Sequence, residues 1–265
     1  MRFDQSLADE LDAMMLEQLL PGDAIESLGR WLADPEKGWQ YTDGTGPHTI
    51  PYSPSSWMAV APWPTTLADR AAANSASVSR ADVVATVRAA QQSGSWATAF
   101  VATQVWGYGV NGYGPYRTGQ VLAQPGAEAV ITEAASLLVD EGAIAAYEKL
   151  HTLDGLGPAF LTKFLYFAGL ALPEVRGPRP LILDSVLARV LRRHATKIGR
   201  TVGYEWSEAI ARRIWRDSNW TSHRYDVYLR WMHAVSDQLA AELIDWPPAP
   251  DVLEVALFSA AWDPV

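Results

Sequence analysis

The segment LHTLDGLGPAFLTKFLYFAG (residues 150–169) holds a short glycine turn between two apolar, helix-like runs. Gly155 and Gly157 can adopt positive φ or let another backbone approach closely, and Pro158 suits the first position of a helix. The segment is therefore predicted to form a helix, a glycine turn and a second helix. Free amide groups at such a turn favour an anion, for example a nucleic-acid phosphate. An ordinary turn between packed helices explains the same residues.

The composition indicates a globular protein with one large domain or two intimate subdomains. The chain has 265 residues, of which 49% are hydrophobic, and this length allows a sizeable core. No apolar run is long enough to cross a membrane, and the acidic start differs from a signal peptide. The absence of cysteine excludes disulfides, cysteine zinc sites and a thiol nucleophile. A cytoplasmic location is therefore expected.

The charge is unevenly distributed along the chain. The net charge of −9 argues against nucleic acid as a partner. Residues 149–230, however, contain 14 Lys or Arg against 7 Asp or Glu, whereas the remainder contains 7 against 23. This basic segment is compatible with a local phosphate-binding face, and equally with charges that merely solvate outer helix faces.

Apolar residues at helical spacing predict a mainly α fold without repeats. Ser79 is a plausible N-cap for a helix with an apolar stripe, and residues 96–106 are ambiguous between helix and strand. Glycine- and proline-rich stretches predict ordered loops over 34–64 and 106–119 and a connection over 173–182. Helices are expected over residues 4–34 with a break at Pro21, 67–92, 96–106, 127–152 with a break near Gly142, 158–169, 184–197, 207–215 and 225–243.

An aspartate follows the hairpin in LILDSVLARVLRR (181–193), where Asp184 is placed to cap a helix. The Gly-Leu-Gly turn, the helix after it, the Gly/Pro-rich connection and the Leu-Asp pair together resemble the helix-hairpin-helix DNA glycosylase superfamily. The segments TKFLYFAG, YLRWMHAVSDQLA and DVLEVALF further resemble a bacterial group with the 8-oxoguanine DNA glycosylase (OGG) fold.

This resemblance implies two helical subdomains with the active cleft between them. It implies a substrate base that is flipped out of double-stranded DNA, because a stacked base cannot be reached. The reaction would cleave the N-glycosidic bond of a modified base, with 8-oxoguanine as the first guess. Asp184 would stabilise positive charge on the sugar and orient the nucleophile.

The resemblance also suggests boundaries and partners. Residues 1–78 would be a region of helices and loops that packs on a glycosylase-like core of residues 79–265. In that core the hairpin would span 143–170 and the aspartate helix 184–197. Hairpin carbonyls could hold a monovalent cation when DNA binds, as in relatives, whereas no cofactor and no metal are needed for the chemistry. We expect a monomer.

Lys163 departs from the pattern of the superfamily. Bifunctional members attack the sugar with a lysine two residues after the second glycine, and here Ala159 occupies that position. Lys163 lies one helical turn further on the same face. It could be a displaced nucleophile that forms a Schiff base, a partner for a phosphate or carboxylate, or a lysine that reaches water from an apolar helix. In the last two cases Asp184 would activate water.

The segment WGYGVNGYGPYRTG (106–119) is predicted to line the site. Its G-x-G-x-x-G match does not indicate a dinucleotide site, because no βαβ unit surrounds it. Aromatic rings could stack on bases, Arg117 could meet a phosphate or a base edge, and Asn111 could enter the space of a flipped base. A loop packed on its own aromatics is the alternative. The candidate pocket residues are Trp106, Asn111, Tyr113, Tyr116 and Arg117.

A second set of residues is expected to grip the DNA backbone: Gly155, Leu156, Gly157 and Arg189. Two other functions stay open at this point. A non-catalytic helix-hairpin-helix DNA-binding protein needs only the turn and a basic surface, and a helical interaction protein needs neither. The five histidines are scattered without zinc-ligand spacing, so no metal site is predicted.

Overall fold

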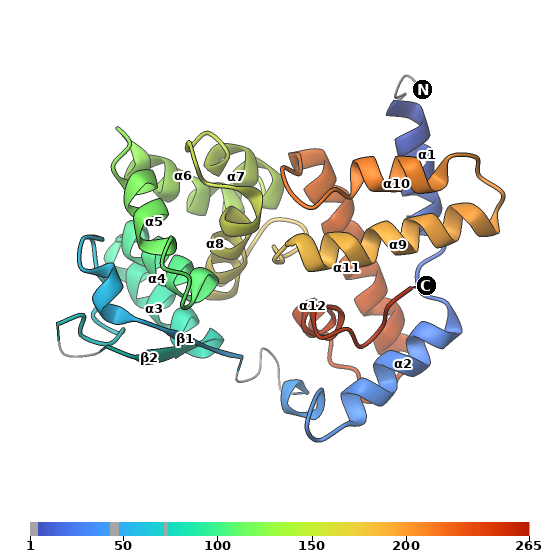
Figure 1. Cartoon of the computed structure of the whole chain (residues 1–265), viewed down its shortest axis with the longest axis horizontal. Coiled ribbons are helices and arrows are strands. Elements are labelled where there is room, and N and C mark those ends of the chain that lie inside the picture. The colour runs from blue at the N-terminus through green and yellow to red at the C-terminus, as the bar shows by residue number, and fades with distance from the viewer. Residues whose placement is uncertain (1–4, 43–47, 72–73, 265) are drawn as a thin grey trace. The chain divides into compact units, whose positions relative to one another are not determined.

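A computed structural model describes residues 5–42, 48–71 and 74–264 of the chain. Over these residues the fold is mainly helical, as predicted, with one small antiparallel sheet (Figure 1). None of the described helices is both long and apolar enough to cross a membrane.

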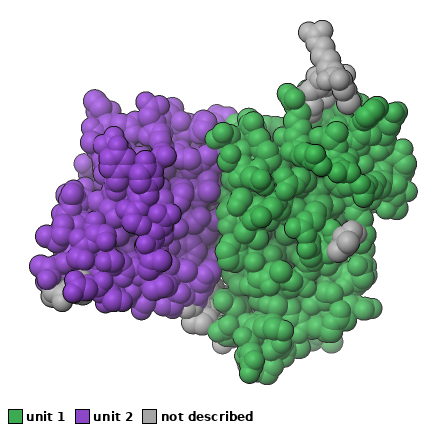
Figure 2. Space-filling model, viewed as in Figure 1, with its two compact units in different colours: residues 1–44, 183–265 green, residues 45–182 purple. Residues whose placement is uncertain are grey.

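The chain divides into two compact units (Figure 2). Unit 1 combines residues 1–44 with 183–265, and unit 2 consists of residues 45–182. The boundary that the sequence suggested, between residues 78 and 79, falls inside unit 2. The packing of residues 1–78 on a separate core stays a prediction.

Unit 2 contains the hairpin. Helices α4 and α8 form its centre, and both are apolar along most of their length. The ring of Phe164 packs against Phe100 and Trp96, with centroids 5.8 and 6.2 Å apart. The elements are β1 (Thr49–Tyr52), η2 (Pro54–Trp57), β2 (Ala76–Ser79), α3 (Arg80–Ser93), α4 (Trp96–Tyr108), α5 (Gly114–Leu122), α6 (Ala127–Asp140), α7 (Ala143–Leu150) and α8 (Pro158–Ala171).

The prediction of helix over residues 67–92 is wrong for its first half. Its second half is correct: Ser79 caps α3 through a capping box with Asp82. Residues 76–79, in contrast, form β2 and pair with β1. Arg70 contacts the segment after η2, because its Nη1 donates to the carbonyls of Trp57, Met58 and Val60. These contacts are distant in sequence, so a local pattern could not indicate them.

The loop predicted over residues 106–119 is shorter in the structure. α4 continues to Tyr108, and α5 already begins at Gly114 with Pro115 in its first turn. Only residues 109–113 connect the two helices. A Cβ built on Gly114 would lie 2.5 Å from Tyr108, so only glycine allows this close start of α5.

Unit 1 is built around α9 and α11. The apolar face of α9 is buried through Leu187, Leu191 and Ala195, and the helix packs against α1, α10 and α12. The elements are α1 (Gln5–Glu17), α2 (Gly22–Ala33), η1 (Trp39–Tyr41), α9 (Ser185–Thr201), α10 (Ser207–Ile214), α11 (Ser222–Glu242) and α12 (Pro250–Phe258).

A buried ion pair and a buried histidine lie inside unit 1. Arg224 donates to Asp12 at 2.5 Å, with both side chains buried, and its guanidinium lies 4.8 Å from the centre of the Trp215 ring. His194 on α9 lies between Trp231 and Trp262, with ring centroids 5.3 Å from each. Burial lowers the pKa of His194 to about 4.

We predict that unit 1 loses stability in mild acid through His194. The unfolded chain takes up a proton near pH 6.5, whereas the folded histidine resists it until about pH 4. The free energy of unfolding should therefore fall as pH drops through this window, by up to about 3 kcal/mol from this group. Urea unfolding of His194→Gln between pH 7 and 4.5 should show a shallower decline than wild type. The same substitution at the exposed His223, His223→Gln, is the control. Equal slopes for His194→Gln and wild type would contradict the prediction.

Candidate functional site

The hairpin turn between α7 and α8 has the helix–turn–helix form that the sequence predicts. Gly155 has φ +76°, a conformation that L side chains rarely adopt. Gly157, in contrast, caps α8 with φ −73° and ψ 157°, so positive φ is needed at the first glycine only. Pro158 begins α8, and a missing N–H costs nothing at this position.

Three backbone amides at the turn are free. Within the described part of the chain, the N–H groups of Gly155, Gly157 and Ala159 have no hydrogen-bond partner. A Cβ built on Gly157 would meet nothing within 4 Å, so the space beside it is open. Free amides at a helix N-terminus with open space in front of them can bind an anion.

Leu156 is an anchor of the turn. Its side chain is buried, and its N–H donates to the Leu153 carbonyl at 3.2 Å. The predicted contact with DNA would therefore involve the amides of the two glycines and of Ala159, because the Leu156 amide already donates to a carbonyl.

Gln124 contacts the segment before the turn, and no local pattern of residues predicts this contact. Its carboxamide donates to the Asp154 carbonyl and accepts from the Asp154 amide, both at 2.9 Å. This pair of bonds ties the segment between α5 and α6 to the hairpin. Thirty residues separate the partners, so only the folded chain brings them together.

Arg117 and two tyrosines lie beside the turn. Nη1 of Arg117 lies 3.7 Å from a Cβ built on Gly155, and its guanidinium lies 5.0 Å from the centre of the Tyr113 ring. The rings of Tyr113 and Tyr116 are 53% and 57% exposed, with centroids 5.4 Å apart. Arg117 therefore lies next to the turn, and the exposed pair of Tyr113 and Tyr116 lies next to Arg117.

Trp106 and Asn111 differ in their surroundings. Trp106 is buried: it packs edge-on against Phe167 and His48, with centroids 5.3 and 5.2 Å apart. Its ring belongs to the core of unit 2 and offers no free face to a base. Asn111 is exposed, and its Oδ1 accepts from the Tyr113 amide at 3.1 Å, which shapes the loop before α5.

Lys163 is half-buried on α8 and turns back toward the start of that helix. Nζ donates to the Ala159 carbonyl at 3.0 Å and lies 5.2 Å from the centre of the Phe160 ring. Its aliphatic stem covers Gly107, where an added Cβ would lie 2.8 Å from Cδ. The amine thus lies at the level of Ala159, one turn before its own Cα.

Asp184 is the N-cap of α9. Its Oδ1 accepts from the amides of Val186 and Leu187 at 2.9 and 3.0 Å. The carboxylate is half-buried, and its Oδ2 has no partner among the described residues. One oxygen thus caps the helix, while the other makes no contact within the described part of the chain.

Two further expectations concern Arg189 and a cation. Arg189 is exposed on α9, and its Nε donates to the Ser185 carbonyl at 2.9 Å. In the hairpin, the carbonyls of His151, Gly155 and Leu156 accept no hydrogen bond from described residues. These oxygens are therefore available as ligands, and the monovalent cation stays a prediction.

The α7–turn–α8 element has the shape and the free amides of a helix-hairpin-helix phosphate-binding motif. Residues 43–258 match the family described as "Putative 8-oxoguanine DNA glycosylase OGG-like protein", and the chain belongs to this family. The family implies a helix-hairpin-helix glycosylase fold and damaged DNA as the substrate. No curated protein and no solved structure matches the chain.

The family match covers both candidate catalytic residues. Lys163 belongs to unit 2 and Asp184 to unit 1, so the predicted cleft between two subdomains stays a prediction. The same holds for the roles of the individual site residues, the monomeric state and the cytoplasmic location.

We predict that the capping role and any chemical role of Asp184 can be separated by two substitutions. Asp184→Ala removes the acceptor for two amides and should lower the free energy of unfolding by about 1 kcal/mol. Asp184→Asn retains an acceptor oxygen and should cost less than about 0.5 kcal/mol. Urea unfolding measures both values, and equal losses for the two variants would show that Oδ1 is not the stabilising contact.

Proposed function

We propose that this protein is a DNA base-excision glycosylase that removes a flipped, modified base from double-stranded DNA, with 8-oxoguanine as the first substrate to test. The observation that carries the proposal is the set of amides at Gly155, Gly157 and Ala159 that have no partner among the described residues, with open space beside Gly157. Neutral donors in this arrangement suit a backbone phosphate. Family membership supports the choice of base.

The proposed reaction breaks the bond between C1′ of the sugar and the base nitrogen. The electron pair of that bond leaves with the base, which takes up a proton, while positive charge develops on the sugar. The Asp184 carboxylate stabilises this charge. In the hydrolytic route it also accepts a proton from the water that attacks C1′.

In the alternative route, the Lys163 amine replaces water as the nucleophile. Its nitrogen attacks C1′ as the base leaves, and opening of the sugar ring gives a Schiff base from which the strand is cut. The position of Nζ beside the Ala159 carbonyl supports this route, because relatives carry their lysine at that position.

The phosphate grip can be tested with a methyl group. Gly157→Ala should leave the free energy of unfolding nearly unchanged, since φ is −73° and the added Cβ meets nothing. The same methyl would occupy the space of the phosphate, so DNA affinity should fall about tenfold, as measured by fluorescence anisotropy. Gly22→Ala, at the first residue of α2 with equally open surroundings, should bind like wild type. Unchanged affinity in Gly157→Ala would remove the hairpin from the DNA interface.

The chemistry can be tested by borohydride trapping on duplexes that each carry one modified base, including 8-oxoguanine. A covalent adduct that disappears in Lys163→Gln would identify the nucleophile and the substrate together. Abasic sites without an adduct, lost in Asp184→Asn, would establish the hydrolytic route. Arg88→Gln, an exposed change on α3, is the control. Binding to duplex DNA without any excision would instead favour a non-catalytic DNA-binding protein.

A further inference from the structure

α9 carries a stripe of positive charge that the proposed hairpin site does not use. Between Ser185 and Thr201 the helix contains five Lys or Arg and no Asp or Glu. Arg189, Arg193, Lys197 and Arg200 recur at intervals of three and four residues, which places them along one side of the helix. The opposite side is apolar and buried. The charge of this segment is therefore concentrated on one exposed surface.

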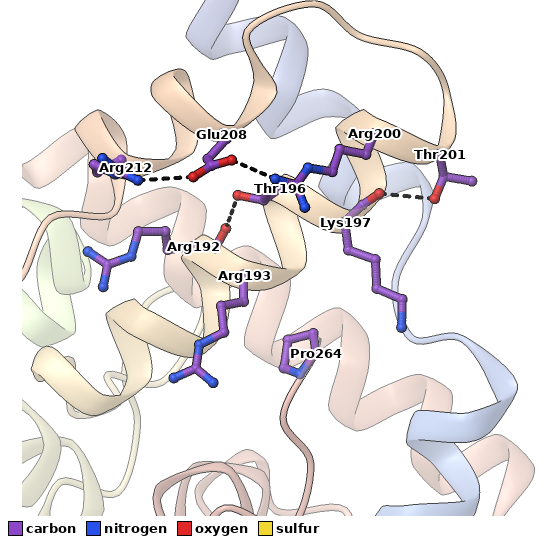
Figure 3. A pocket seen from close by; sticks show the side chains of 9 residues that line it. All are labelled: Arg192, Arg193, Thr196, Lys197, Arg200, Thr201, Glu208, Arg212 and Pro264. Atoms are coloured by element: carbon purple, nitrogen blue, oxygen red, sulfur yellow. Dashed lines mark hydrogen bonds and ion pairs between the residues drawn. The ribbon is translucent and has the colours of Figure 1, made fainter.

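The second half of this stripe lines a pocket between α9 and α10 (Figure 3). Five cationic side chains and a single carboxylate line it, together with two threonines and a proline. No aromatic side chain is part of the lining, so the pocket has no surface on which a nucleobase or another flat ring could stack. Its chemistry suits phosphate groups. The cations are Arg192, Arg193, Lys197, Arg200 and Arg212.

Glu208 is the one carboxylate of the pocket, and it bridges two of the arginines. It accepts from Arg200 at 2.5 Å and from Arg212 at 3.0 Å (Figure 3). Carboxylates and phosphates are both oxyanions that arginine binds through its N–H groups. The Glu208 carboxylate, between two guanidinium groups, therefore occupies a position that a phosphate oxygen would take. Glu208 thus neutralises part of the pocket when no ligand is bound.

The other cations have carboxylate partners at the rim. Arg192 pairs with Asp217, Arg193 with Asp263 and Lys197 with Asp23. These aspartates are 46% to 68% exposed, so each pair is worth little, about 1 kcal/mol or less. A phosphate can therefore replace these partners at low cost.

We propose that this pocket, which we call the α9 phosphate pocket, binds backbone phosphates of duplex DNA beside the target base. The inference rests on the proposed function. The stripe from Arg189 to Arg200 spans 12 residues, about 16 Å along the helix. A DNA strand places about four to five phosphates in that length, at about 3.4 Å each along the duplex axis. A linear row of cations without aromatic side chains fits a strand better than a compact nucleotide.

The test measures affinity for a duplex with one 8-oxoguanine at several salt concentrations. The double variant Arg193→Gln/Lys197→Gln should bind at least tenfold more weakly at 0.15 M salt. The slope of log K against log salt should decrease by about 1 to 2, one unit for each lost phosphate contact. Glu208→Gln should bind about threefold more tightly, because it releases Arg200 and Arg212.

The pair of Arg30 and Glu26 on α2 provides matched controls. These residues form an exposed ion pair outside the pocket, at 3.7 Å. Glu26→Gln removes one negative charge, as Glu208→Gln does, and Arg30→Gln removes one positive charge, half the change made by the double variant. They therefore measure the effect of net charge for each unit of charge. If the pocket variants behave like these controls, the α9 phosphate pocket does not bind DNA.

Single-turnover excision at saturating DNA separates this inference from the proposed function. The pocket variants should excise at the wild-type rate once the DNA is bound, because none of the changed groups meets the sugar. If the wild type excises the base and the pocket variants bind DNA like the controls, the pocket inference alone is overturned. A wild-type protein that neither binds nor excises would overturn both. ATP that binds to wild type but not to the double variant, while the double variant retains wild-type DNA affinity, would reassign the pocket to nucleotides.

Discussion

The carboxamide of Gln124 fixes the hairpin turn on which the candidate DNA contact depends. A turn with glycines at two of its positions has high conformational freedom, and ordering it costs entropy. Gln124 offsets this cost by bonding both the amide and the carbonyl of Asp154, while the buried Leu156 anchors the turn from the other side. The amides of Gly155 and Gly157 are then ordered in advance, so that in the proposed complex a phosphate would not have to order them on binding.

The sequence predicted the parts of this site that depend on neighbours along the chain. A glycine turn followed by proline, and an aspartate before an amphipathic helix, are local signals, and both gave the observed hairpin and the cap at Asp184. Non-local contacts were not predictable in the same way. The pairing of β1 with β2, the loop contacts of Arg70 and the clamp by Gln124 all join residues ten or more positions apart. Trp106 shows the same limit, since the apolar neighbours that bury it come from other segments.

Asp184 shows how a structural role and a chemical role can share one side chain. A carboxylate at a helix N-terminus is stabilised by the amides in front of it and by the helix dipole, and the proposed reaction uses the same carboxylate. The two amide bonds also fix the rotation of the carboxylate, because both reach Oδ1. The direction of the free Oδ2 is therefore set by the cap. Loss of activity in a variant that still folds is the only result that distinguishes the chemical role from the cap.

The acidic composition of the chain is compatible with DNA as the partner and has a consequence for specificity. The net charge of −9 repels a phosphate backbone at long range, so binding has to come from a few short-range contacts. The hairpin amides are neutral and release few counterions, whereas each lysine or arginine of α9 that meets a phosphate adds to the salt dependence. The slope of log K against log salt therefore reports the number of cationic contacts with phosphates, and it is insensitive to the amide contacts. A shallow slope with high affinity for a modified duplex would mean that the hairpin and the base pocket dominate recognition. A steep slope would assign the larger share to α9. Under the proposed function, an acidic protein binds undamaged DNA weakly. Its preference for a single modified base over the many undamaged sites is therefore larger.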